Sequence, residues 1–236
     1  MIAVDFHVHS IFSLCGLHTI LELLDRARTL GMKGFAVTDH GPVIGGRLNS
    51  VFFERFVSPD PEVRILKGIE CNLLDREGTI DLPTEYLQFL DIVLCGIHTN
   101  FVKDLGRAAN TQSMIAALRR NPAIDIVTHP NDANYPVDYS TLARAAAETG
   151  VALELNNSKL RYPRSTPAEA AALLAACKEH RCSIAVCSDT HAIHELGDDG
   201  AVAPLLKQAD FPEELIVNRT PETAFNFVKQ RRSLRR

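Results

Sequence analysis

The chain has 236 residues, of which 46% are hydrophobic and 23% charged, and its formal net charge is −4. This length and hydrophobic content are enough for one well-buried core, and they fall in the range of single-domain α/β barrels. A general nucleic-acid or membrane-surface partner is disfavoured, because there is no broad basic excess to neutralise phosphates. We therefore expect one domain over residues 1–236, with small anions as the remaining class of charged substrate.

The cysteines and the N-terminal residues predict a cytoplasmic protein without a membrane partner. No Cys-x-x-Cys pair occurs, and the cysteine spacing is far sparser than in a secreted disulfide scaffold. The first ten residues carry Asp5, His7 and His9 where a signal peptide needs an apolar stretch. No apolar run approaches the ~18 residues of a membrane span. The six cysteines are Cys15, Cys71, Cys95, Cys177, Cys182 and Cys187.

Short apolar runs predict seven β-strands. Several of them are apolar almost throughout, as expected for parallel strands that are covered on both faces. Seven strand and helix units without a break in composition indicate one α/β barrel rather than two domains. The predicted strands cover residues 2–6, 34–38, 64–69, 91–97, 125–128, 151–155 and 183–186.

Helix signals lie between these strands. Capping boxes begin at Thr19 and Thr166, Pro follows both Thr166 and Thr220 at the first helical position, and Gly31 and Gly150 are expected just past two helix ends. A weakly helical stretch follows the Gly-rich loop 41–46, and residues 75–78 form the turn of a hairpin expected to leave the core. The other predicted helices cover residues 111–120, 138–148 and 201–208, and the helix that begins after Thr220 ends in a basic tail.

Residues with metal-ligand chemistry follow the predicted strands. His7 and His9 are two apart in an extended segment, so both imidazoles point to one face. In a closed parallel barrel, the carboxyl ends of all strands surround one mouth, where the active sites of such barrels lie. The mouth then offers more ligands than one four-coordinate zinc uses, which implies two or three ions. The candidate ligands are His7, His9, His40, Glu70, His98, His129, Asp189 and His191.

Three carboxylates near these histidines have candidate roles. Glu70 is suited to bridge two ions ~3.5–4 Å apart, because each carboxylate oxygen can bind one of them. Asp5 and Asp39 each stand beside a candidate histidine. Two readings of them stay open: acceptors that fix an imidazole tautomer, or solvent-exposed loop carboxylates.

Six motifs in order along the chain resemble those of the polymerase and histidinol phosphatase (PHP) superfamily. Finer matches, such as Gly68–Asn72 and Val217–Pro221, are similar to its YcdX-like phosphatase branch. The resemblance implies a distorted seven-stranded (β/α) TIM-like barrel with a trinuclear metal site. The motifs are His7-Val8-His9, Thr38-Asp39-His40, Gly68-Ile69-Glu70, His98, Thr128-His129-Pro130 and Ser188-Asp189-Thr190-His191.

The resemblance also implies which residues hold each ion. The family's last ligand for the third ion comes from the loop after the first strand and is commonly His or Asp, whereas this chain has Cys15 there. A thiolate is a good zinc ligand, so Cys15 biases the site toward zinc, with manganese or iron as alternatives and His18 as a substitute ligand. The implied sets are His7, His9, Glu70 and Asp189 for one ion, Glu70, His98 and His129 for a second, and His40, His191 and Cys15 for the third.

A multinuclear zinc site activates water near neutral pH and neutralises charge on phosphoryl oxygens. We therefore expect a metal-dependent phosphomonoesterase with a small phosphorylated substrate, and Glu70 and Asp189 in catalytic roles. The phosphate also needs a cation at the mouth, for which Arg161 is the first candidate. The other candidate cations are Lys159, Arg164, Arg47 and Lys103.

Other functions fit part of the pattern. The same ligands could serve metal-assisted attack on a carbonyl carbon, although the resemblance favours phosphate esters. A phosphodiesterase or exonuclease is the main alternative, and the only basic cluster is the tail Arg231–Arg236, of a kind that is usually frayed and solvated. A non-catalytic metal-binding module would need neither three ions nor an open mouth.

Loops 42–49 and 101–109 are expected to shape the substrate pocket. His180 and His194 are expected on the surface.

Overall fold

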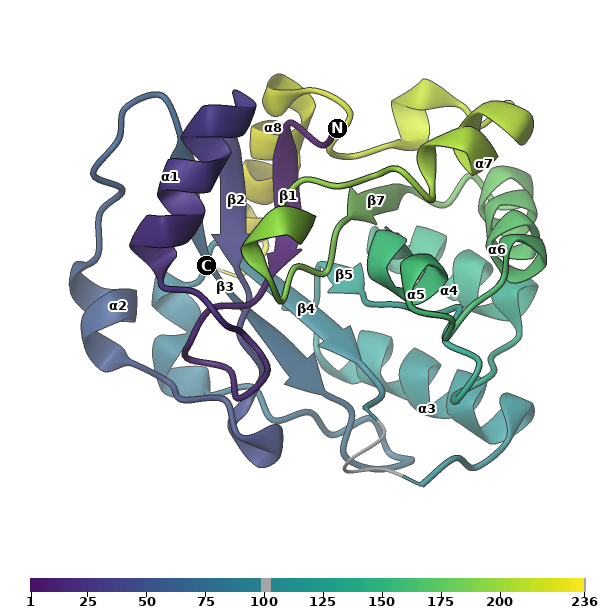
Figure 1. Ribbon diagram of the computed structural model, residues 1–236. Coiled ribbons are helices and arrows are strands. Elements are labelled where there is room, and N and C mark those ends of the chain that lie inside the picture. Colours follow the sequence, from purple (N-terminus) through teal and green to yellow (C-terminus); the bar gives the residue numbers. More distant parts are fainter. Residues whose placement is uncertain (99–102, 236) are drawn as a thin grey trace.

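Seven parallel strands form one sheet in sequence order in the computed structural model, which describes residues 1–98 and 103–235. Figure 1 shows the strands side by side with the helices packed around them. The order is that of a (β/α) barrel, in which each strand pairs with the next along the chain. The strands are β1 (Val4–Val8), β2 (Gly34–Val37), β3 (Arg64–Asn72), β4 (Ile92–Gly96), β5 (Ile126–Val127), β6 (Ala152–Asn156) and β7 (Ile184–Cys187).

The first and last strands meet at their carboxyl ends. His9 N donates to Thr190 O at 2.9 Å, and Thr190 N donates to His7 O at 3.2 Å. Val8 and Thr190 form a parallel bridge. The sheet is therefore nearly closed, and the predicted distorted seven-stranded barrel is confirmed.

Three strands continue past the residue where the apolar run ends. β1 reaches Val8 instead of Phe6, β3 reaches Asn72 instead of Ile69, and β6 reaches Asn156 instead of Leu155. The added residues include His7, Glu70 and Asn156, which are polar and fully buried. A polar side chain that faces the mouth interrupts the apolar pattern but leaves the backbone ladder intact, so the sequence pattern ended these strands too early.

The helices cover the outside of the barrel. Thr19 and Thr166 form the predicted capping boxes, and Gly31 and Gly150 take left-handed conformations at φ 69° and 66°. One helix, α5, was not predicted, because it starts directly at the end of β6 with Asn156 as its cap. The helices are α1 (Ile20–Leu30), α2 (Ser50–Arg55), α3 (Arg107–Arg120), α4 (Tyr139–Thr149), α5 (Asn157–Arg161), α6 (Pro167–Glu179), α7 (Ala203–Gln208) and α8 (Pro221–Ser233).

The segment after β3 stays against the barrel. Leu73 pairs with Ile80 in an antiparallel bridge, which confirms the predicted turn between them. Gly78 has φ 82° and its carbonyl accepts from Asn121 Nδ2 at 2.8 Å, at the end of α3. A side chain at Gly78 would meet the backbone of Ala117. The prediction that this hairpin leaves the core was wrong, because the close approach of Gly78 holds the turn on α3.

Two apolar clusters hold the fold. One lies between the sheet and the helices, and a smaller one fills the inside of the barrel with Phe6, Leu66 and Leu94. Helix α8 joins the inner cluster through Ala224 and Val228 and closes the end of the barrel opposite the mouth. Figure 1 shows α8 in yellow behind β1 and β2. No helix within the described ranges 1–98 and 103–235 has both the length and the apolar character needed to cross a membrane.

The basic C-terminal tail is docked rather than frayed. Arg231 is buried and its Nε donates to Asp125 Oδ1 at 3.1 Å, while its Nη2 donates to Ile124 O at 2.6 Å. Arg235 binds the other oxygen of Asp125, and Arg232 pairs with Asp91 at 2.6 Å. The expectation of a solvated tail was therefore wrong for Arg231, Arg232 and Arg235; Arg236 lies outside the described residues. The carboxylates at the start of β4 and β5 required these partners, because a buried charge is stable only when paired.

We predict that Arg231→Met lowers the free energy of unfolding by about 3 kcal/mol, because it leaves the buried carboxylate of Asp125 with one partner fewer. Urea unfolding monitored by circular dichroism measures the change. The matched control is Arg219→Met, which removes an exposed pair with Glu213 and should cost no more than about 1 kcal/mol. Equal effects of the two variants would contradict the role of the tail.

Candidate metal centre

The mouth of the barrel brings all eight candidate ligands from six strands together. They come from the end of each strand except β6, as expected when the carboxyl ends of parallel strands surround one opening. The side chains of His7, His9 and Glu70 are almost fully enclosed, whereas His191 is about one-third exposed and marks the open side. The remaining members of the set are His40, His98, His129 and Asp189.

Glu70 lies at the centre of the mouth. Its Oε1 faces one group of imidazoles and its Oε2 faces another, which is the arrangement of a carboxylate that bridges two cations. Burial alone would raise the pKa of Glu70, but the positive potential of the histidines, led by His7, holds it well below its ordinary value. Around Oε1 are the Nε2 atoms of His7 at 3.3 Å, His98 at 3.1 Å and His129 at 3.1 Å; around Oε2 are His40 Nδ1 at 2.9 Å and His9 Nε2 at 3.5 Å.

A second convergence lies between β1 and β7. The Nε2 atoms of His7 and His9 are 3.1 Å apart, and both lie 3.5 Å from Asp189 Oδ1. Two imidazole nitrogens that face each other and a carboxylate oxygen form a ready set of zinc donors. The three ligand atoms lie within 4.8 Å of one another.

Cys15 lies at the outer side of the same mouth. Its sulfur and one nitrogen each of His9 and His40 form another group of potential ligands within 4.8 Å of one another. Burial raises the pKa of Cys15, but hydrogen bonds to His191 and then His40 outweigh it and lower the pKa to about 7. The alternative ligand, His18, is absent from every ligand group found within residues 1–98 and 103–235.

The residues present fit a metal centre. Among the described residues, His40 Nδ1, Glu70 Oε2 and both ring nitrogens of His98 are buried without a hydrogen-bond partner. His40 Nδ1 and Glu70 Oε2 are only 2.9 Å apart, yet they lack hydrogen-bond geometry. Buried polar atoms of this kind are costly to leave unpaired, and a shared cation would satisfy His40 Nδ1, Glu70 Oε2 and one ring nitrogen of His98. Burial also lowers the pKa of His98 to about 4, which keeps its nitrogen free to bind a metal.

Two candidate ligands have strained backbones. His129 has φ 34° and Asp189 has φ 56°, in the left-handed region that non-glycine residues rarely adopt. Such strain costs about 1–3 kcal/mol per residue and is typical of functional sites, where the surrounding contacts enforce it. The backbone at these two strand ends is therefore shaped by the site rather than by local preference.

Asp5 and Asp39 match neither hypothesis made from the sequence, since they neither bind an imidazole nor lie free in a solvent-exposed loop. Asp5 is buried and accepts backbone N–H groups from His7 at 3.2 Å and from Ser188 at 3.2 Å. Asp39 accepts from Ser10 N at 2.7 Å and from Ser10 Oγ at 2.6 Å. The two carboxylates thus hold the backbone of the ligand-bearing segments, and burial raises the pKa of Asp5 to about 6.

The cation closest to the candidate ligands is Lys159. Its Nζ lies 2.5 Å from Asp189 Oδ2 and its side chain is buried. Arg161, the first candidate from the sequence, is half exposed and pairs with Asp198 at 2.6 Å. Arg164 pairs with Asp132. Arg47 and Lys103 are both exposed and have no ion pair among the pairs described.

Sequence reasoning missed Glu154, on β6. Its carboxylate is fully buried and lies 2.7 Å from His7 Nδ1. The sequence did carry a signal, because Glu154 and Asn156 are two apart at the end of an apolar strand, as His7 and His9 are.

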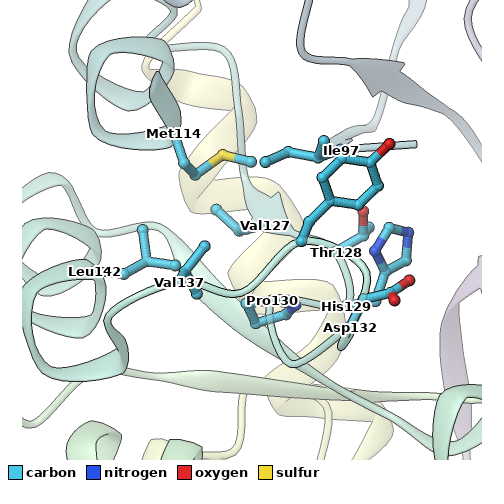
Figure 2. A pocket seen from close by; sticks show the side chains of 10 residues that line it. Ile97, Met114, Val127, Thr128, His129, Pro130, Asp132, Val137 and Leu142 are labelled. Carbon is cyan, nitrogen blue, oxygen red and sulfur yellow. The ribbon is translucent and has the colours of Figure 1, made fainter. Parts of the chain in front are cut away.

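A small apolar cavity lies behind His129 (Figure 2). Met114, Ile97 and Leu142 form its apolar side, and Thr128, His129 and Asp132 lie at its other side. Its volume of about 10 Å³ is room for one water molecule. It is therefore not a substrate pocket. Of the loops expected to shape that pocket, residues 42–44 form a 3₁₀ turn, and residues 101–102 lie outside the described part of the chain.

Comparison with known proteins agrees with this geometry. Residues 5–158 match the PHP domain. A probable phosphatase of Shewanella sp. (strain MR-4) is 37% identical over 235 residues, covering 97% of this chain and 92% of the relative. A probable phosphatase of Edwardsiella ictaluri (strain 93-146) is 33% identical over 238 residues, with 98% and 96% covered.

A solved structure shares the fold. It is histidinol phosphate phosphatase from Lactococcus lactis subsp. lactis, complexed with zinc, L-histidinol and phosphate. The two structures superpose with a TM-score of 0.62 at 19% identity, covering 89% of this chain and 94% of the other. At this identity the likeness supports the barrel fold alone.

We predict that iodoacetamide alkylates Cys15 of the metal-free protein quickly at pH 7 and that Zn²⁺ protects it, because a coordinated thiolate is no longer a free nucleophile. Peptide mass spectrometry at timed intervals measures the modification. The other five cysteines are buried and serve as internal controls that should stay unmodified. An alkylation rate that zinc does not change would contradict a role for Cys15 as a ligand.

Proposed function

The chain belongs to the PHP domain family and is a metal-dependent phosphatase, and we propose that it hydrolyses phosphomonoesters of small molecules at a centre of two or three metal ions. The observation that carries this proposal is the position of Glu70, whose two oxygens face separate groups of imidazoles. A single structural ion would need neither a second group of donors nor a partly open mouth.

Zinc is the proposed metal. The donors are mostly imidazoles, and Cys15 adds a soft thiolate that zinc accepts more readily than manganese. The neighbouring histidinol phosphate phosphatase structure, which contains zinc, is consistent with this choice. Manganese or iron stay as alternatives, above all for the ions that would bind the oxygens of Glu70.

We propose that the ion sites follow the three ligand sets implied by the resemblance. The ligand groups of the structure are arranged slightly differently, since His9 and His40 each belong to two of the three groups. An imidazole binds an ion through one ring nitrogen, so the imidazoles must be divided between neighbouring ions when these bind, whereas Glu70 can bind two ions through its two oxygens. The proposed ligands are His7, His9, Cys15, His40, Glu70, His98, His129, Asp189 and His191.

The bound ions would supply an activated water for attack on phosphorus and would offset the charge of the phosphoryl oxygens. The protein's own part is to hold the donors in a largely enclosed site. His7, His9 and Glu70 are enclosed, so their interactions act in a low-dielectric surrounding. The less covered His191 marks the side on which a phosphate ester could enter.

Lys159 is the protein cation best placed for the substrate. Its ammonium group already neutralises Asp189, and it stands at the start of α5, directly beyond the end of β6. A phosphate at the mouth would therefore meet a buried, fixed positive charge. Arg161, on the same short helix, stays a candidate for contact with the outer part of the substrate.

The competing functions have less support. A phosphodiesterase or exonuclease needs a basic surface for the nucleic-acid backbone, but Arg231, Arg232 and Arg235 bind carboxylates at the opposite end of the barrel. A non-catalytic metal-binding module would need neither a second group of donors nor a partly open mouth. We also propose a cytoplasmic location, because all six cysteines are free thiols. We propose a single domain over residues 1–236, because one sheet forms the barrel and α8 closes its end.

We predict that Glu70→Gln abolishes phosphomonoesterase activity and lowers the metal content, because an amide cannot bridge two cations through two anionic oxygens. The test combines metal analysis of the purified protein with a panel of phosphomonoesters and phosphodiesters under Zn²⁺, Mn²⁺ and Mg²⁺. Glu62→Gln, at an exposed position, is the control and should behave as wild type. Wild-type protein that hydrolyses only diesters would overturn the proposed substrate class.

A separate prediction concerns the two cations of α5. Lys159→Met should raise KM for phosphomonoesters about tenfold or more, the effect of losing a hydrogen bond of ~1.5–3 kcal/mol to a charged group. Arg161→Ala should change KM less, since that side chain is half exposed. Steady-state kinetics at saturating zinc measure both variants. The reverse order of effects would make Arg161 the phosphate-binding cation.

A further inference from the structure

Strand β6 supplies no candidate ligand, yet a charged residue lies in its middle. Glu154 is flanked by Leu153 and Leu155, and all three are fully buried. An ionised carboxylate in such a place costs several kcal/mol unless its oxygens are paired. The contacts of Glu154 therefore show what the strand contributes to the mouth.

The two oxygens of Glu154 bind different parts of the candidate metal centre. Oε1 lies 2.7 Å from His7 Nδ1. Oε2 accepts the backbone N–H of His129 at 2.6 Å and Nδ2 of Asn156 at 3.0 Å. Asn156 Nδ2 also lies 3.1 Å from Asp189 Oδ2. One carboxylate thus contacts two candidate ligands directly and a third through Asn156.

The contact with His7 selects one tautomer of its ring. A carboxylate only accepts hydrogen bonds, so His7 Nδ1 must carry the proton. In the neutral ring that binds a metal, the other nitrogen, Nε2, then presents its lone pair to the mouth, where it faces Glu70 Oε1 at 3.3 Å and Asp189 Oδ1 at 3.5 Å. A ring with the opposite tautomer would place a proton where the ion has to bind.

The contact with His129 holds a strained backbone. His129 has φ 34°, and its N–H group donates to Glu154 at 2.6 Å. In this conformation His129 Nε2 lies 3.1 Å from Glu70 Oε1. Without the anchor, the residue could relax to φ < 0 and withdraw its imidazole.

We propose that Glu154 is a positioning residue that couples two ion sites, by fixing the tautomer of His7 in one and the backbone of His129 in the other. The proposal rests on the proposed function only in requiring that the mouth binds metal. It predicts that loss of Glu154 weakens both sites together, although Glu154 itself binds no ion.

Glu154→Gln is the variant that tests it, because the amide keeps the size of the side chain but has one acceptor oxygen for the two donors of His7 and His129. The affinity for Zn²⁺, measured by competition with a chelating dye, should fall about 10–100-fold, as is typical when the partner of a ligating histidine is lost. Long-range ¹H–¹⁵N spectra of the zinc-loaded protein should show His7 with its proton on Nδ1 and its Nε2 bound to the ion in wild type, and a loss of this single arrangement in the variant.

Asp125→Asn is the matched control. It also removes a buried carboxylate, but at the opposite end of the barrel, so it should lower the unfolding free energy and leave zinc affinity unchanged. Wild-type zinc affinity in folded Glu154→Gln protein would overturn the proposal. If the variant does not fold, the zinc-loaded wild-type spectrum alone decides, because a His7 ring that binds zinc through Nδ1, or binds no zinc, also overturns it. Wild-type protein that binds zinc but hydrolyses no phosphomonoester would refute the proposed function and not the role of Glu154.

Discussion

The burial of carboxylates at the mouth is the constraint on which the rest of the structure depends. Glu70, Glu154 and Asp189 are all at most 1% exposed, and each would cost several kcal/mol to bury without partners. Lys159 and the histidines supply the compensating charge and hydrogen bonds: the surrounding carboxylates, led by Glu154, raise the pKa of His7 against the effect of burial. Dications would replace protons in this role. The mouth is therefore organised around positive charge before any ion binds.

The same physical problem is solved differently at the other end of the barrel. There Asp125 and Asp91 precede β5 and β4, and arginines of α8 and the tail bind them permanently. Arginine stays charged and presents several donors, so these pairs hold the fold without leaving a free coordination position. At the mouth, imidazoles take most of that role, and they release a proton to bind a metal. The arginine pairs at one end of the barrel thus stabilise the fold, whereas the imidazoles at the mouth can exchange protons for metal ions.

Much of this could be predicted from the sequence, for identifiable reasons. Apolar runs located all seven strands because parallel strands are covered on both faces, and ligand-type residues after those runs marked the mouth because barrel closure brings strand ends together. The partners of individual charges could not be predicted. Lys159 and Arg161 are two residues apart on one short helix, and only the direction of α5 decides that the first reaches Asp189 while the second reaches Asp198. The docking of Arg231 likewise depends on the position of α8 beneath the barrel.

Glu154 shows where the sequence held more information than the apolar pattern used. Residues two apart in a strand share a face, and polar pairs with this spacing end three of the strands: His7 and His9, Glu70 and Asn72, Glu154 and Asn156. Two of these pairs contain candidate ligands, and the third pair binds them from behind. The spacing therefore identifies side chains that face the mouth. Their distance from an ion then distinguishes ligands from positioning residues. That distance follows from barrel closure, and so it can be read only from the folded chain.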